Sequence, residues 1–209
     1  MKIISAEEVH AALSYPALVD ALEEAYAGKF SMPPRQVFLL DPEGGKNDAF
    51  AVLPSWSDEF IGVKSFTYFP EATEPHKSLY SKIMLFDREH GEPLALVDGT
   101  TVTFWRTAGI SGLATRLLAR EDASSLLVLG TGNLSSYMIL ANASVRPLTK
   151  VMVWGRDPEK AAAVIAQVSG QLPDIEFSVV EDREAACGEA DIVVAATGSH
   201  EPVVLGDWI

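Results

Sequence analysis

The chain has 209 residues, 48% hydrophobic and 22% charged, a balance typical of a globular protein with a substantial core. Its 16 Lys and Arg against 29 Asp and Glu give a net charge of −13, which disfavours binding to nucleic acid or to an anionic membrane surface. One cysteine, Cys187, excludes an intrachain disulfide and a Cys-rich zinc site. The N-terminus does not read as a secretory signal, so we expect a reduced, cytoplasmic protein.

Two short helices are expected at the start of the chain. Ser5 and Glu8 form a capping-box pattern, in which each side chain bonds to the backbone N–H of the other residue. A second helix carries Pro16 in its first turn and repeats apolar residues at four-residue spacing until Gly28. Residues 32–34, Met-Pro-Pro, then break the helical phase.

From Arg35 to about Val97 the period changes to that of antiparallel strands. Turn-like stretches separate short apolar or alternating runs, which predict a sheet of about five strands. The runs are Val37–Leu40, Ala49–Leu53, Ile61–Phe69, Lys82–Phe86 and Leu94–Val97. A long helix is expected next, over 100–120, and its small residues indicate close packing on a neighbouring element.

After residue 120 apolar runs alternate with helical segments, which predicts a parallel, doubly wound sheet. The predicted strands are Ser125–Leu129, Val151–Trp154, Ile175–Val180 and Asp191–Ala196, with helices over 134–145, 158–170 and 183–187. We therefore expect an α/β protein: a β-rich α+β domain over 1–120 with a long connecting helix, then a Rossmann-type dinucleotide-binding domain over 121–209. Four strands are fewer than the usual six, so we expect this domain to be truncated and the sequence to be a fragment.

A glycine-rich loop follows the first of these strands. The pattern G-x-G-x-x-S lies between a predicted strand and a predicted helix, which is the context a dinucleotide-binding motif requires. Gly130 makes the tight turn, Gly132 lets backbone N–H groups approach a pyrophosphate, and Ser135 is small enough for helix–strand packing. The expected cofactor-binding residues of the loop are Gly130, Thr131, Gly132, Asn133, Leu134 and Ser135.

The end of the second strand favours NADP(H) over NAD(H). Gly155 stands where an NAD site carries an acid, and Arg156 follows, where a cation accommodates a 2′-phosphate. Asp157 is either a ribose ligand or the N-cap of the next helix. We also expect Ala196 and Thr197, at the end of the fourth strand, to contact the cofactor.

Three basic residues of the chain stand next to apolar or proline-rich sequence. Arg35 follows two prolines, Lys64 lies inside the run 61–69, and Arg106 lies between bulky and small apolar residues. A buried cation is costly unless it is paired, so these residues either form a shared anion site, meet internal acids or extend to solvent.

The sequence resembles the ornithine cyclodeaminase/mu-crystallin family, in order over nearly the whole chain. The segments that carry the resemblance are 62–64 (GVK), 83–87 (IMLFD), 91–99 (GEPLALVDG), 106–108 (RTA), 130–132 (GTG), 153–156 (VWGR) and 190–197 (ADIVVAAT). The resemblance implies a substrate-binding domain that dimerises and a Rossmann domain. It also implies that Arg35, Lys64 and Arg106 occupy substrate-carboxylate and catalytic positions, with Ser78 where the cyclodeaminases usually carry Thr.

Two departures leave the substrate open. The stretch after Lys64 lacks the asparagine that family members often carry, and the catalytic aspartate of ornithine cyclisation would lie beyond Ile209. We expect an NAD(P)-dependent homodimeric oxidoreductase acting at the carbon–nitrogen bond of an amino or cyclic imino acid, foremost a Δ1-pyrroline-2-carboxylate-type ketimine reductase. In this enzyme Lys64 would be catalytic, and Arg35, Lys64, Ser78 and Arg106 would bind substrate; no metal is expected. The alternatives are an ornithine cyclodeaminase and a non-catalytic NADPH-dependent binding protein.

Overall fold

A computed structural model describes residues 1–199 and 201–209, which divide into two compact units. The first unit comprises residues 1–13 and 24–103, and the second comprises residues 14–23 and 104–209. The first division falls just before helix α2 (Tyr15–Ala27), and the other two fall inside α2 and α3 (Gly99–Leu118). The change of sequence period near residue 120 instead marks the start of the parallel sheet. A functional division at residue 120 stays a prediction.

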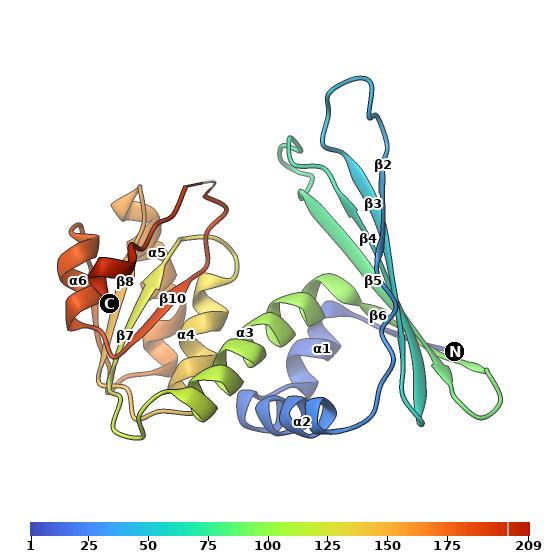
Figure 1. Ribbon diagram of the computed structural model, residues 1–209, viewed down its shortest axis with the longest axis horizontal. Helices are drawn as coiled ribbons and strands as arrows, with labels where there is room; N and C mark the ends of the chain where they lie inside the picture. Colours follow the sequence, from blue (N-terminus) through green and yellow to red (C-terminus); the bar gives the residue numbers. More distant parts are fainter. Residues whose placement is uncertain (200) are drawn as a thin grey trace. The chain divides into compact units, whose positions relative to one another are not determined.

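The first unit is built on a six-stranded sheet with the order β1-β6-β5-β4-β3-β2 (Figure 1). Its strands are β1 (Lys2–Ile4), β2 (Gln36–Leu39), β3 (Ala49–Trp56), β4 (Phe60–Tyr68), β5 (Leu79–Asp87) and β6 (Pro93–Asp98). The five predicted antiparallel strands are confirmed, and the structure adds β1, which pairs parallel with β6. Three residues are too few for alternation to reveal a strand.

Helix α1 (Ala6–Ala12) follows β1 and begins at the predicted capping box. The amide of Glu8 donates to Ser5 Oγ at 3.3 Å, and the amide of Ser5 donates to Glu8 Oε2 at 2.9 Å. These two bonds satisfy backbone donors that the first turn of a helix otherwise leaves without partners.

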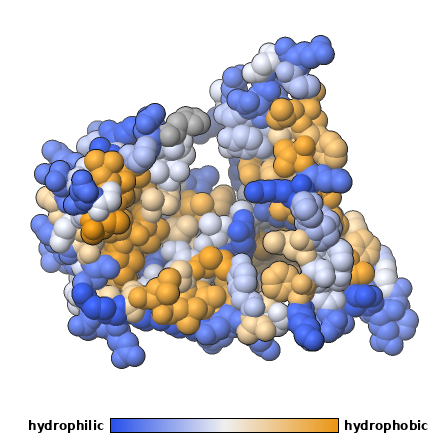
Figure 2. Space-filling model, viewed as in Figure 1, coloured by the Kyte–Doolittle hydropathy of each residue, from blue (hydrophilic) through white to orange (hydrophobic). Residues whose placement is uncertain are grey.

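The six-stranded sheet has one buried and one exposed apolar face around β3. Residues that stand opposite one another in antiparallel strands point to the same face. Ala51 and Ser81 belong to a buried row, whereas the neighbouring row carries Phe38, Phe50 and Tyr80, which are 49%, 36% and 49% exposed. The rings of Phe38 and Phe50 stack at 6.3 Å, and Figure 2 shows hydrophobic side chains gathered over these strands. We call Phe38, Phe50 and Tyr80 the aromatic row.

The second unit contains a four-stranded, fully parallel sheet with the order β10-β7-β8-β9. Its elements are β7 (Ser125–Leu129), α4 (Ser135–Ala143), β8 (Lys150–Trp154), α5 (Pro158–Val168), η1 (Ser169–Gln171), β9 (Glu176–Val179), α6 (Arg183–Glu189), β10 (Ile192–Ala195) and η2 (Gly206–Trp208). Helices α4 and α5 cover one face, and α6 and η2 cover the other (Figure 1). Both faces of β7 are therefore buried, which explains its uninterrupted apolar sequence.

The small residues of α3 pack as the sequence indicates. A Cβ at Gly109 would lie 2.8 Å from Leu22 Cδ1 of α2, and one at Gly112 would lie 3.1 Å from the carbonyl oxygen of Ala141 in α4. Glycine at these two positions lets α3 approach α2 and α4 closely. Within the described part of the chain, no helix combines the length and apolarity needed to cross a membrane.

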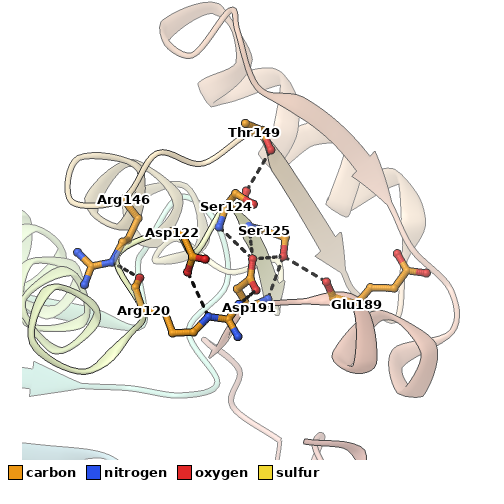
Figure 3. A network of polar contacts seen from close by, with 8 residues as sticks. All are labelled: Arg120, Asp122, Ser124, Ser125, Arg146, Thr149, Glu189 and Asp191. Atoms are coloured by element: carbon orange, nitrogen blue, oxygen red, sulfur yellow. Dashed lines mark hydrogen bonds and ion pairs between the residues drawn. The ribbon is translucent and has the colours of Figure 1, made fainter.

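A polar network closes the amino-terminal edge of the parallel sheet (Figure 3). Asp191 accepts hydrogen bonds from the amides of Ser124 and Ser125, at 2.9 and 3.0 Å, and pairs with Arg120. Arg146 donates to the carbonyl oxygens of residues 116, 119 and 120, and so caps the end of α3. Hydrogen bonds and an ion pair thus connect this edge, and the opposite, carboxyl edge carries the glycine loop.

Candidate functional site

The carboxyl edge of the parallel sheet contains a topological switch point between β7 and β10. The chain passes from β7 to β8 and β9 on one side and returns to β10 on the other. Ligands of open α/β sheets bind in the crevice at such a reversal. The loops after β7 and β10 lie side by side there, since the amide of Ala196 donates to the carbonyl oxygen of Leu129 at 2.8 Å.

Gly130 is required by this close approach. Its φ of +127° lies in a region that side chains rarely adopt, and a Cβ would stand 2.2 Å from the carbonyl oxygen of Ala196. Ser135 is fully buried, and its hydroxyl donates to the carbonyl oxygen of Gly130 at 2.9 Å. Ser135 therefore stands at the position of the motif's third glycine, where it packs tightly and also fixes the turn at Gly130.

Gly132 plays a different part, because a Cβ there would meet no atom of the described residues within 4 Å. Gly132 and Asn133 are exposed, and the N-cap residue Leu134 makes no side-chain capping bond to α4 among the described residues. Open space and backbone donors at a helix N-terminus suit a pyrophosphate. The loop therefore fits a dinucleotide.

The end of β8 carries the three residues assigned to ribose recognition. A Cβ at Gly155 would lie 2.4 Å from Thr131 Cγ2, so a side chain at the position where an NAD site holds an acid would require Thr131 to move. Asp157 serves as the N-cap of α5, with Oδ1 accepting from the amide of Glu159 at 3.0 Å. Arg156 is exposed and forms no ion pair among the described residues.

Ala196 and Thr197 extend from β10 into the same crevice. The chain there is partly exposed, and Thr197 Oγ1 accepts from the amide of Ser199 at 3.1 Å. The structure thus gathers the loop after β7, the end of β8 and the end of β10 at one edge of one sheet. Contact of these residues with a cofactor stays a prediction.

Lys64 lies on β4, in the buried face of the first unit's sheet. It is half-buried, and its Nζ donates to Thr103 Oγ1 of α3 at 2.6 Å. The ammonium also lies 5.6 Å from the centre of the Phe66 ring, a cation–π contact. The sequence located Lys64 but gave no sign of Thr103, because 39 residues separate the two.

Arg35 and Ser78 also belong to the first unit and stand at strand ends. Arg35 precedes β2 and Ser78 precedes β5, and both residues are exposed. The carbonyl oxygen of Ser78 accepts from the amide of Phe69 at 2.8 Å, which closes the loop between β4 and β5. Their side chains form no ion pair or hydrogen bond among the described residues.

Arg106 lies on α3, in the second unit, and is exposed. Of the alternatives that the sequence left open, the structure shows this side chain extending to solvent, because the apolar residues beside it point to other sides of the helix. Trp105, for example, stacks on Tyr15 with ring centres 4.5 Å apart. Arg106 makes no ion pair with any described residue, so its guanidinium is available to a ligand.

Tyr15 is a feature that the sequence did not indicate. Its side chain is 7% exposed, and its hydroxyl has no hydrogen-bond partner among residues 1–199 and 201–209. Burial raises the pKa of this hydroxyl far above its ordinary value. No group of His, Cys, Asp and Glu side chains in the described residues is arranged to hold a metal.

Comparison with known proteins places this geometry in a family. The sequence profile of the ornithine cyclodeaminase/mu-crystallin family matches residues 2–209. A Delta(1)-pyrroline-2-carboxylate reductase from Colwellia psychrerythraea is 49% identical over 212 aligned positions, which cover 100% of this chain and 67% of the relative. A protein of the same name from Paracoccus denitrificans is 34% identical over 94% of this chain and 61% of the relative.

A solved structure is also similar over the whole chain. The Delta(1)-pyrroline-2-carboxylate reductase of Thermococcus litoralis, in complex with NADH and L-proline, superposes with a TM-score of 0.90 at 32% identity. The match covers 100% of this chain and 66% of that one. The chain thus spans about two thirds of the length of the relatives it matches.

Proposed function

Because the chain belongs to the ornithine cyclodeaminase/mu-crystallin family, we propose that the protein is a nicotinamide-dependent reductase of a cyclic imino acid of the Δ1-pyrroline-2-carboxylate type. The observation that carries the proposal is the relative of that name, 49% identical across the whole chain. The product is the corresponding cyclic amino acid, proline for the five-membered ring. In this proposal residues 121–209 bind the cofactor and residues 1–120 bind the substrate. The reaction takes place in the cytoplasm.

The second unit holds the cofactor at the carboxyl edge of its sheet. When bound, the nicotinamide supplies a hydride to the α-carbon of the imine. Gly132 leaves room for the pyrophosphate, and the uncapped first turn of α4 offers N–H donors to it. Gly130 and Ser135 hold the loop in this shape, because one has the required φ and the other bonds back to it.

We further propose that NADPH binds more tightly than NADH. Gly155 carries no acid to repel a 2′-phosphate, Asp157 is engaged with α5, and Arg156 is exposed without an ion-pair partner among the described residues. Arg156→Ala should weaken NADPH binding about tenfold or more while NADH is little affected, because a charge-assisted hydrogen bond to the phosphate is lost. Lys160→Ala, which removes a nearby exposed cation on α5, is the control. Equal loss for both cofactors would refute the 2′-phosphate role.

The basic residues bind the substrate. Arg35 and Arg106 hold the carboxylate, since a guanidinium offers two parallel N–H donors to it. Lys64 bonds the carboxylate or delivers a proton to the imine nitrogen, so that hydride at carbon and proton at nitrogen together complete the reduction. Ser78 lines the substrate site. The guanidinium groups of Arg35 and Arg106 are exposed and form no ion pair with residues 1–199 or 201–209, which supports these roles.

One assay separates the candidate activities. The complete protein is mixed with NADPH and Δ1-pyrroline-2-carboxylate, and cofactor absorbance is followed; a parallel reaction with ornithine and NAD⁺ is followed by ammonia release. We expect cofactor oxidation in the first reaction and no ammonia in the second. Ammonia release alone would indicate a cyclodeaminase, and binding without turnover would indicate a ligand-binding protein.

We propose that two copies associate through residues 1–120. The aromatic row leaves Phe38, Phe50 and Tyr80 between 36% and 49% exposed, and sheet faces of this kind are usually covered. A second copy covers the row symmetrically in a two-fold dimer. Light scattering of the complete protein should give twice the chain mass at micromolar concentration, and Phe50→Asp should shift it toward the monomer. A monomer in the unsubstituted protein would contradict the proposal.

A further inference from the structure

We propose that Thr103 is a positioning residue that holds the ammonium group of Lys64 for the reaction; this inference rests on the proposed function. Lys64 Nζ lies 2.6 Å from Thr103 Oγ1, and Thr103 Oγ1 lies 2.6 Å from the carbonyl oxygen of Gly99. These contacts connect the middle of β4 to the first turn of α3, inside the first unit.

The direction of both hydrogen bonds follows from the chemistry of the three groups. A carbonyl oxygen accepts but never donates, so the hydroxyl hydrogen of Thr103 points to Gly99. A lysine ammonium donates but never accepts, so the lone pairs of the same hydroxyl face Lys64. The hydroxyl therefore cannot rotate to serve another partner without breaking one bond. One of the three N–H donors of Lys64 is thereby directed at Thr103.

The Lys64 contact distinguishes this threonine from an ordinary helical one. A threonine in a helix often donates to the carbonyl four residues earlier, and that bond alone has a structural explanation. The second bond joins residues 39 positions apart and brings a charged group from another element onto the same oxygen. The Phe66 ring, 5.6 Å from Nζ, restricts the ammonium from another direction.

This arrangement matters for catalysis because lysine has a long, flexible stem. A catalytic group held in place before substrate binds avoids the loss of conformational freedom at the moment of reaction. Thr103 and Phe66 supply that order from within one unit. Thr103 thus acts through Lys64 and does not need to contact the reacting atoms itself.

The kinetic test compares Thr103→Val with Thr103→Ser in the complete protein. Valine keeps the shape and removes the hydroxyl; serine keeps the hydroxyl. With saturating NADPH and Δ1-pyrroline-2-carboxylate, we expect kcat to fall about tenfold or more in Thr103→Val, the loss of one charge-assisted hydrogen bond, and to remain within about threefold in Thr103→Ser. Thr115 lies on α3 like Thr103, and its hydroxyl donates to Asn142 Oδ1 of α4. Thr115→Val, the control, should lower the melting temperature but leave kcat unchanged.

A second readout needs no activity. The rate of Lys64 acetylation, measured by mass spectrometry, should rise several-fold in Thr103→Val and return toward the original in Thr103→Ser. Lys82, which pairs with Asp98 at 2.9 Å, is the internal reference. Unchanged acetylation, or a kcat within twofold in Thr103→Val, overturns the inference. An unsubstituted protein without reductase activity but with the expected acetylation pattern instead refutes the proposed function and leaves the contact standing.

Discussion

Replacing Asp191 by Asn should destabilise the second unit, by an amount that depends on pH. The carboxylate accepts from the amides of Ser124 and Ser125 and from the Ser125 hydroxyl, at 2.8–3.0 Å, and it pairs with Arg120 (Figure 3). These partners lower the pKa of Asp191 from 3.8 to about 2. A depression of this size corresponds to roughly 2 kcal/mol of stability, and about 1–2 kcal/mol after screening by solvent, since the side chain is 23% exposed.

The sign of the pH dependence follows from the depressed pKa. The unfolded chain binds a proton to Asp191 at higher pH than the folded chain does, so the contribution is complete well above pH 3.8 and is lost as pH falls toward 2. Urea unfolding of the complete protein at pH 7 and pH 3 measures it. The difference between the original protein and Asp191→Asn should shrink to about half at pH 3.

The matched control is Asp122→Asn, which removes another carboxylate from the same arginine. Asp122 lies 3.2 Å from Arg120 and is 85% exposed, so its loss should cost less than about 0.5 kcal/mol. Equal effects of the two substitutions, or an Asp191→Asn effect that is the same at both pH values, would refute the reasoning, because the backbone hydrogen bonds to Asp191 would then contribute nothing.

Four further substitutions test the site and the helix packing beside it. Gly130→Ala should lower the melting temperature by several degrees because its Cβ meets Ala196, whereas Gly132→Ala should leave the melting temperature unchanged and weaken NADPH binding. Arg106→Lys should reduce kcat/KM by the equivalent of roughly 1.5–3 kcal/mol without loss of stability, since the exposed side chain keeps its charge but loses the two-donor geometry; intact activity would place the carboxylate ligand elsewhere. Tyr15→Phe should raise the melting temperature by about 2–4 °C, because it removes a buried hydroxyl that has no hydrogen-bond partner in the described part of the chain; a lower melting temperature would show that the hydroxyl is bonded in solution.

Local signals in the sequence were enough to predict most elements and the glycine loop. The capping box at Ser5, the strand at 125–129 and the turn at Gly130 each depend on atoms within a few residues, or on a period that the chain itself displays. The parallel sheet followed from the alternation of strands and helices. The glycine loop could therefore be placed at the carboxyl edge of the parallel sheet before any tertiary contact was known.

Tertiary structure alone decided the contacts between distant residues. Three such contacts are the pairing of β1 with β6, the hydrogen bond from Lys64 to Thr103 and the cap that Arg146 places on α3. The local sequence of one partner carries no information about where the other partner lies. The sequence left the exposure of Arg106 open for a related reason: apolar neighbours along a helix point to different sides, and only the packing of α3 determines which side is buried. The sequence by itself therefore determined the elements and the motif, and the fold determined which side chains can act together.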